Sequence, residues 1–361
     1  MIVLETVQAN LSLEKIKSIG LEGRNSDVYI AKDPQLNAFL VAKEITKESL
    51  KSQEIQNYFL EAQLLNEASH PHIMPIRYAA QDTEKIYITM PYYSQGSINS
   101  LLDERMLTVR EILKYSLDFL SGLLFIHIKG MVHLDVKPTN IIINDCDRAI
   151  LTDFGLSRYL NEYGLAEQKS VYTKHISPQY LMTNSRTIQD DIYQAGITIY
   201  RMCNGNDDFE NQLGNYIVDQ GVDIEKFKTD ILNEAFPNRK TYLPHIPKKL
   251  RAVISKMLFA DTSHRYSNVL DVINDLSLID ENLDWEYNYD KDKNIRSWFL
   301  ETENNNYTMN LHESNGNFVT TGIKYLKKSK RQNQIRDWNT NYTSLDNAYK
   351  GIERLLKQVK I

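Results

Sequence analysis

The sequence of 361 residues has only two cysteines and no long apolar run. Cys146 and Cys203 lie far apart and form no C-x-x-C pair, which argues against a disulfide framework or a zinc site and fits a reducing compartment. The first residues lack the basic and apolar segments of a signal peptide. No stretch approaches the ~18 consecutive apolar residues of a membrane helix. We therefore expect a soluble, cytoplasmic protein without a membrane partner.

The net charge is also small, −5 at pH 7, and does not identify a partner. It is unevenly distributed, because residues 322–361 contain ten Lys or Arg and three Asp or Glu, whereas residues 1–280 carry a net charge of −7. The chain length fits two domains, or one bilobed domain with an appendage, at the usual ~100–200 residues per domain. The basic C-terminal segment is therefore a candidate for a separate unit.

Residue patterns divide the first 280 residues into a strand-rich part and a helical part. β-Branched and aromatic runs predict strands within residues 12–45 and at 86–90, with a helical pattern over 49–68 between them. Apolar residues then recur at helical spacing over residues 112–128, 190–203, 247–259 and 267–278. We expect a small sheet with one helix, followed by a larger helical unit.

The composition becomes acidic and aromatic over residues 280–292, where we place a domain boundary. Beyond it, alternating patterns predict strands over residues 295–301, 307–311 and 318–326. The Asn315-Gly316 step between the last two favours a tight hairpin turn. Ser344 is placed to cap a final amphipathic helix. These signals predict a β-meander followed by a helix.

The residues that indicate chemistry lie in two short motifs. The run His-Leu-Asp-Val-Lys-Pro-Thr-Asn ends at Asn140, and Asp-Phe-Gly begins at Asp153. Phosphoryl transfer requires a positioned carboxylate and metal ions on the phosphates. Asp135 suits the carboxylate that orients the acceptor hydroxyl, Lys137 can neutralise the transferring phosphate, and Asn140 and Asp153 offer the oxygen ligands that Mg²⁺ prefers. Either motif alone would be an ordinary loop or turn, but the two together indicate a phosphoryl-transfer site.

These motifs, in this order, resemble those of the eukaryotic-type (Hanks-type) protein kinases over roughly residues 10–280. The resemblance implies a mixed α+β fold with a small β-rich N-lobe, residues 10–90, and a larger helical C-lobe, residues 94–280. Residues 281–361 then form a small α+β accessory domain outside the resemblance. The implied activity is transfer of the γ-phosphate of Mg-ATP to a protein substrate, with autophosphorylation.

The resemblance also implies an ATP site. Leu-Val-Ala-Lys ending at Lys43 is similar to the V-A-I-K motif, which assigns Lys43 to the α- and β-phosphates, and Glu61 resembles the glutamate that pairs with this lysine. The glycine-rich phosphate loop is incomplete, since two of its three glycine positions carry other residues. The remaining assignments are Gly20, Gly23 and Ser26 in that loop, and Val28, Val41, Met90, Tyr92 and Ile142 around the adenine.

Three further positions resemble family features, one of them with a substitution. The Asp-Val-Lys order, with Lys137 two residues after the aspartate, is similar to the serine/threonine class. Gln179 replaces the glutamate of the A-P-E motif, and we expect its partner to be Arg265. Asp191 resembles the buried aspartate that braces the catalytic loop.

Leu134 replaces the arginine of the family's H-R-D motif, which receives a phosphate carried by the activation segment. Phosphorylation of the activation segment is therefore a less obvious way to switch on the activity. Ser170, Tyr172 and Thr173 are either phosphorylation sites or ordinary loop hydroxyls.

Three alternatives to a protein kinase stay open: a pseudokinase scaffold, a kinase of small-molecule alcohols, and a regulator that acts through the basic C-terminal domain. That domain would bind nucleic acid through basic residues beside aromatic ones, or would serve as a protein docking or dimerisation module. The residues concerned are Lys327, Lys328, Lys330, Arg331, Trp338 and Tyr342.

Overall fold

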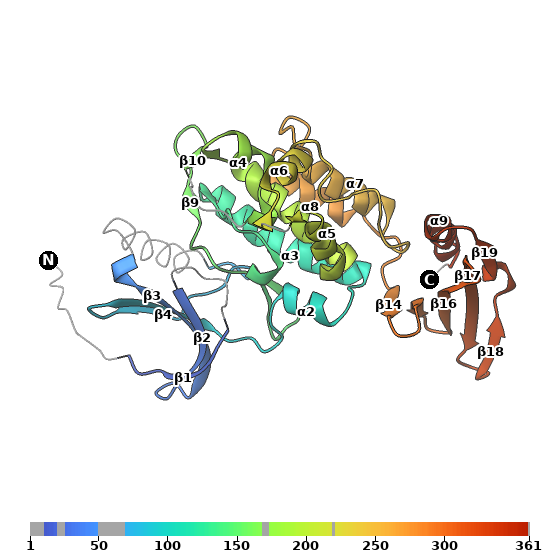
Figure 1. Cartoon of the computed structure of the whole chain (residues 1–361). Coiled ribbons are helices and arrows are strands. Elements are labelled where there is room, and N and C mark those ends of the chain that lie inside the picture. The colour runs from blue at the N-terminus through green and yellow to red at the C-terminus, as the bar shows by residue number, and fades with distance from the viewer. Residues whose placement is uncertain (1–10, 20–25, 50–68, 168–172, 219–220, 360–361) are drawn as a thin grey trace.

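The computed structural model describes residues 11–19, 26–49, 69–167, 173–218 and 221–359. Figure 1 shows an N-terminal sheet, a helical lobe and a C-terminal β-rich region in succession. The predicted α+β class with a β-rich N-lobe and a helical C-lobe is confirmed. Nearly all of the helix predicted over residues 49–68 lies outside the described residues, as do Gly20, Gly23 and Glu61.

The N-terminal sheet is antiparallel and has the strand order β1-β2-β3-β5-β4. Its strands are β1 (Glu14–Ser18), β2 (Ser26–Asp33), β3 (Ala38–Thr46), β4 (Tyr78–Gln81) and β5 (Lys85–Pro91). Val41 pairs with Met90 on β5, and Val28 pairs with Lys43. Because cross-strand partners share a face and successive residues alternate, these four side chains project from the same face of the sheet.

The helical lobe is built around two long helices, α3 and α5. A capping box of Thr108 and Glu111 begins α3, and one of Thr187 and Asp190 begins α5. The helices are α2 (Ile98–Glu104), α3 (Val109–Ile128), α4 (Pro178–Met182), α5 (Ile188–Gly214), α6 (Ile224–Leu232), α7 (Lys248–Met257) and α8 (Val269–Ser277). None of the helices in the described ranges is both long and apolar enough to cross a membrane.

Short strand pairs lie among these helices. They are β6 (Met131–Val132) with β9 (Arg158–Tyr159), β7 (Ile141–Ile143) with β8 (Ala149–Leu151), β10 (Ala166–Glu167) with β11 (Ser185–Arg186), and β12 (Ile217–Val218) with β13 (Gly221–Val222). The catalytic-loop motif lies between β6 and β7, and Asp153 follows β8. Both predicted motifs are therefore located at strand ends.

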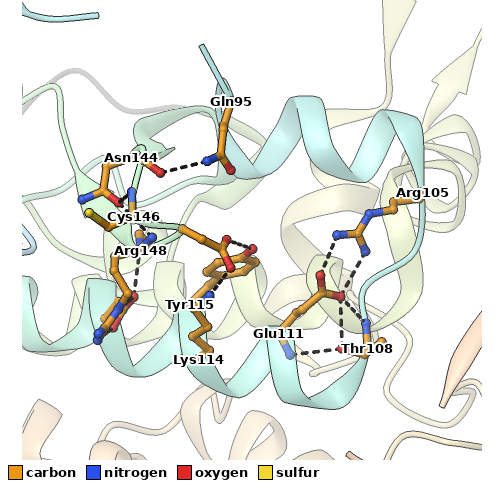
Figure 2. A network of polar contacts seen from close by, with 12 residues as sticks. Gln95, Arg105, Thr108, Glu111, Lys114, Tyr115, Asn144, Cys146 and Arg148 are labelled. Carbon is orange, nitrogen blue, oxygen red and sulfur yellow. Dashed lines mark hydrogen bonds and ion pairs between the residues drawn. The ribbon is translucent and has the colours of Figure 1, made fainter. Parts of the chain in front are cut away.

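The β7–β8 turn is fixed to α3 by side-chain contacts (Figure 2). Lys114 and Tyr115, on α3, both contact the carboxylate of Asp147 in the turn, Tyr115 at 2.6 Å. Arg148 Nε donates to the buried carboxylate of Asp118 at 2.8 Å. These contacts hold the hairpin that leads directly to Asp153.

The C-terminal region forms a six-stranded antiparallel sheet with one helix. Its elements are β14 (Glu286–Asp290), β15 (Ile295–Glu301), β16 (Asn305–Ser314), β17 (Asn317–Leu326), β18 (Arg331–Gln334), β19 (Thr340–Tyr342) and α9 (Leu345–Leu356). The predicted hairpin turn is confirmed, because Asn315 and Gly316 both have positive φ, 50° and 75°. Ser344 caps α9 as predicted, its side chain accepting from the amide of Asn347. Trp338, predicted beside the basic cluster, is instead only 4% exposed, in the core of this region.

The C-terminal region packs against the end of the helical lobe remote from the N-terminal sheet (Figure 1). Arg110, on α3, forms a two-pronged ion pair with Asp284 at 2.5 and 2.8 Å. Trp298 Nε1, on β15, donates to His245 Nδ1 at 3.3 Å, and both side chains are buried completely. A buried imidazole of the helical lobe thus accepts from a buried tryptophan of the C-terminal region, so solvent is excluded from this contact although the two apolar cores are separate.

Candidate active site

The catalytic-loop side chains converge on Asp135, which is only 5% exposed. Lys137 Nζ lies 3.1 Å from Asp135 Oδ2. Asn140 Nδ2 donates to the same Oδ2 at 2.8 Å and to the Asp135 carbonyl at 2.9 Å. The other carboxylate oxygen, Oδ1, is buried and has no hydrogen-bond partner within the described part of the chain. Burial raises the pKa of Asp135, although Lys137 opposes this effect.

Lys43 and Asp153 form an ion pair of 2.6 Å across 110 residues of sequence. Lys43 is on β3 of the N-terminal sheet, and Asp153 follows β8 of the helical lobe, so the pair joins the two lobes. The charge of Lys43 lowers the pKa of Asp153 to about 2. Asp153 nevertheless keeps 43% of its side chain exposed, which leaves it accessible to a ligand.

Gly155 lies close beside this pair. A Cβ atom on Gly155 would lie 3.2 Å from Lys43 Nζ and 3.4 Å from Asp153 Oδ1, which is closer than most side-chain contacts. The glycine of the Asp-Phe-Gly motif therefore keeps space around the two charges.

The predicted adenine-site residues are divided between the N-terminal sheet and the helical lobe. The sheet face that carries Lys43 also carries Val28, Val41 and Met90, all half-buried. Met90 Sδ lies 3.8 Å from Thr152 Oγ1, the residue before Asp153. The remaining predicted positions that the structure describes are Ser26 at the start of β2, Tyr92 just after β5 and Ile142 on β7 of the helical lobe.

Two supporting contacts expected from the family resemblance are confirmed. Asp191, on α5, accepts from the amides of His133 at 2.8 Å and Leu134 at 2.6 Å. Arg265 Nη1 donates to Gln179 Oε1 at 2.7 Å. Burial lowers the pKa of Arg265 to about 10, so this cation depends on the acceptors around it.

Leu134, in place of the family's arginine, belongs to a small apolar cluster. It is 3% exposed and packs with Val132 and with Ala166 on β10, beyond Asp153. An apolar contact therefore links the catalytic loop to the segment that follows Asp153. Of the predicted phosphorylation sites, Ser170 and Tyr172 lie outside the described residues, and the backbone of Thr173 begins a 3₁₀ turn.

Sequence reasoning missed one residue at this site, Gln194 on α5. Its amide binds the backbone on both sides of Asp135, through Leu134 and Val136. The signal in the sequence was a polar residue one helical turn after Asp191, within the mostly apolar stretch of residues 192–203.

Residues 13–276 match the protein kinase domain family, so the chain belongs to that family. The chain is similar to the serine/threonine-protein kinase PknD of Protochlamydia amoebophila, with 26% identity over 299 residues that cover 72% of this chain and 29% of the relative. It is also similar to the probable serine/threonine-protein kinase PknB of Lactococcus lactis, with 26% identity over 267 residues, 73% of this chain and 41% of the relative. The serine/threonine-protein kinase PrkC of Bacillus subtilis is 25% identical over 258 residues, 70% of this chain and 38% of the relative.

The predicted resemblance to Hanks-type kinases is thus confirmed. The aligned part spans less than half the length of each of these relatives. Protein kinases in general use ATP with divalent metal ions and act on proteins.

Proposed function

We propose that this chain is an ATP-dependent protein kinase that phosphorylates serine or threonine residues of proteins, including its own. The observation that carries the proposal is the ion pair of Lys43 with Asp153, joining the two lobes at 2.6 Å in a chain of the protein kinase family. The names of the relatives, all serine/threonine kinases, support the class of acceptor. The complete set of Lys43, Asp135, Lys137, Asn140 and Asp153 disfavours a pseudokinase.

In this proposal Asp135 orients the acceptor hydroxyl and receives its proton. Its Oδ1 atom is buried and has no partner in the described ranges, so it has the capacity to accept one further hydrogen bond. The raised pKa makes this carboxylate a stronger base than an exposed aspartate. Lys137, 3.1 Å from Oδ2, balances the negative charge as phosphate approaches.

We propose Asn140 and Asp153 as ligands of Mg²⁺. Both amide hydrogens of Asn140 go to Asp135, so its carbonyl oxygen is the atom that can coordinate a cation, and Asp153 is ionised at neutral pH. No three His, Cys, Asp or Glu side chains gather as a metal site in the residues that the structure describes. This donor set fits Mg²⁺, which takes few protein ligands and keeps phosphate oxygens and water. When bound, the ion neutralises charge on the phosphates.

The nucleotide contacts follow from the same arrangement. Lys43 would bind the α- and β-phosphates, and Val28 and Val41 would cover one face of the adenine, with Ile142 on the other. Met90 and the backbone of Tyr92 would border its edge. The assignments of Glu61 as the partner of Lys43, and of Gly20, Gly23 and Ser26 as the phosphate loop, rest on the family resemblance.

We also propose a division into a kinase domain, residues 10–280, and an accessory domain, residues 281–361. The end of the family match at residue 276 and the separate C-terminal core support this boundary. A cytoplasmic location, and a protein or nucleic-acid partner for the basic C-terminal domain, stay predictions from composition. Burial of Trp338 removes one of the two aromatic residues from the support for nucleic acid, and the half-buried Tyr342 and the basic charge stay.

A phosphate-transfer assay with a matched pair of variants tests the function. We expect the purified chain to incorporate label from γ-labelled ATP into itself and a generic protein substrate, and Asp135→Asn to reduce the rate by at least ~100-fold. Asp145→Asn removes an exposed carboxylate in the β7–β8 turn and should leave the rate unchanged. Mass spectrometry should place the phosphate on serine or threonine. Equal incorporation by the Asp135→Asn variant and the wild type would contradict the assignment.

A further inference from the structure

The backbone on either side of Asp135 is held by one side chain, Gln194. Its Oε1 atom accepts from the amide of Val136 at 3.0 Å, and its Nε2 atom donates to the carbonyl of Leu134 at 3.0 Å. The side chain is only 2% exposed. Gln194 therefore uses both ends of its amide to bind the two peptide groups that enclose the catalytic aspartate.

Gln194 belongs to a polar series along one face of α5. Asp191, Gln194 and Thr198 are spaced at i, i+3 and i+7, which places them on the same side of a helix. Asp191 takes the two amides before Asp135, and Thr198 Oγ1 lies 3.4 Å from the carbonyl of Val136. A single helix thus provides hydrogen-bond partners for the residues on both sides of Asp135, namely His133, Leu134 and Val136.

The loop needs such support because its backbone is not relaxed. Leu134 has φ of 64°, a conformation that a leucine rarely adopts and that persists only where the surroundings impose it. Its carbonyl is one of the two groups that Gln194 binds. Removing the amide would leave that carbonyl and the Val136 amide unpaired in a buried site, and the loop would shift to find other partners.

We propose that Gln194 is a positioning residue for phosphoryl transfer, which sets the orientation of the Asp135 carboxylate by fixing the peptide groups beside it. The inference rests on the proposed kinase function and adds a residue to it. Gln194 acts on Asp135 through the backbone, since the hydrogen-bond partners of its side chain in the described part of the chain are main-chain atoms of the catalytic loop. We therefore expect it to affect the rate of transfer and not the affinity for nucleotide.

A second glutamine on the same helix provides a matched control. Gln189 Nε2 also binds two backbone groups, the carbonyls of Thr262 at 2.9 Å and Tyr266 at 3.1 Å, but these lie outside the catalytic loop. We expect Gln194→Ala to lower kcat by about 10- to 100-fold, the effect of a displacement of about 1 Å in a catalytic group. The KM for ATP should stay within about two-fold. Gln189→Ala should keep the kcat of the wild type.

Two further measurements separate positioning from general destabilisation. Hydrogen exchange at the Val136 amide should be faster in Gln194→Ala and unchanged in Gln189→Ala. Gln194→Met fills a similar volume without burying a charge but can bind neither peptide group, so it should fold and show a kcat as low as that of Gln194→Ala. Unchanged kcat in Gln194→Ala, or equal losses in Gln194→Ala and Gln189→Ala, would overturn the inference. Should the wild type transfer no phosphate, the proposed function fails, and unchanged exchange at Val136 would then overturn the positioning role.

Discussion

At the scale of single residues, the two aspartates of the site are driven in opposite directions by their surroundings. Burial raises the pKa of Asp135, whereas the charge of Lys43 lowers the pKa of Asp153 to about 2. Asp153 is therefore a permanent anion, suited to hold a cation, and Asp135 is the better proton acceptor. The two aspartates therefore have different chemical roles because Asp135 is buried, whereas Asp153 lies beside the amine of Lys43.

Replacement of Lys43 by methionine tests this separation. Lys43→Met keeps the length of the side chain and removes its charge, so we expect phosphate transfer to fall by at least ~100-fold because a group that binds phosphate oxygens is lost. The pKa of Asp153 should return toward its ordinary value of 3.8. A carboxyl group whose pKa is lower in the folded state than in the unfolded chain stabilises the folded state. This contribution is complete at pH values above the pKa of the unfolded chain and is lost as the pH falls through the pKa of the folded state. The stability difference between wild type and variant should therefore be constant above about pH 5 and shrink as the pH falls from 3.8 toward 2.

Urea unfolding between pH 3 and 7 measures this difference. Lys17→Met removes an exposed lysine of the same sheet. It should leave both the activity and the dependence of the unfolding free energy on acid pH unchanged. If the unfolding free energy of Lys43→Met decreased at low pH in the same way as that of the wild type, the ion pair would not lower the pKa of Asp153.

At the scale of elements, strands with a buried face were predictable and short polar ones were not. β15 has the predicted bounds, Ile295–Glu301, because alternation of apolar and polar residues marks a strand with one buried face. β18, Arg331–Gln334, is entirely exposed and polar, so only its pairing with β17 makes it a strand. The helix predicted over residues 190–203 lies within the first part of α5, and after a kink at the non-helical Gly205 a second, largely polar segment runs to Gly214. Nonlocal pairing and packing decide such segments, and local sequence does not encode them.

The same limit applies to the site. Lys43, Asp135 and Asp153 were predictable because spacing and residue type carry the chemistry. Gln194 was not, since a glutamine on a buried helix gives no sign of which loop it faces. Its role depends on how α5 crosses the catalytic loop, which is a property of the packed lobe.

A close approach within the C-terminal sheet gives the next prediction. A Cβ atom on Gly322, in β17, would lie 2.4 Å from the Cβ atom of Trp338, whose ring is buried. Ala is usually better than Gly in a strand, but here the backbone would have to move. We expect Gly322→Ala to lower the free energy of unfolding by about 1–3 kcal/mol or more, as overpacked cores do. Gly214→Ala, at the end of α5 with no atom within 4 Å, should stabilise by up to about 1 kcal/mol. Urea denaturation of both variants measures whether each change lowers or raises the free energy of unfolding. A Gly322→Ala variant as stable as the wild type would contradict the close contact between Gly322 and Trp338.

At the scale of the whole molecule, the C-terminal region is joined to the helical lobe by charge at its rim and by a buried contact at its centre. Arg110 pairs with Asp284, and Arg251 Nη1 lies 3.2 Å from Glu353 on α9. Between them, the imidazole of His245 accepts from Trp298 and stacks on Tyr287 at a ring distance of 6.1 Å. The Arg110–Asp284 pair is exposed and the Arg251–Glu353 pair is half-buried, whereas the contact of His245 with Trp298 is completely buried.

The buried imidazole makes this attachment sensitive to acid. Because Trp298 donates to Nδ1, the ring hydrogen is on Nε2, and protonation would break that bond and bury a cation near Arg251. Burial lowers the pKa of His245 to about 3, well below the value of about 6.5 in an unfolded chain. Below pH 6.5 the unfolded state therefore binds a proton that the folded state does not, and stability falls as the pH decreases. The loss from this residue between pH 7 and pH 5 is about 2 kcal/mol.

His245→Gln isolates that contribution, since an amide oxygen can still accept from Trp298 but does not titrate in this range. The wild type should lose about 2 kcal/mol more free energy of unfolding between pH 7 and pH 5 than the variant does. Other histidines whose burial lowers their pKa, His70, His133 and His175, contribute equally to both proteins and cancel in the comparison. His264→Gln, which removes an imidazole that is 71% exposed, should keep the pH dependence of the wild type. The same pH dependence in His245→Gln and the wild type would mean that the imidazole is already solvated, and hence that the C-terminal region is not packed on the helical lobe in solution.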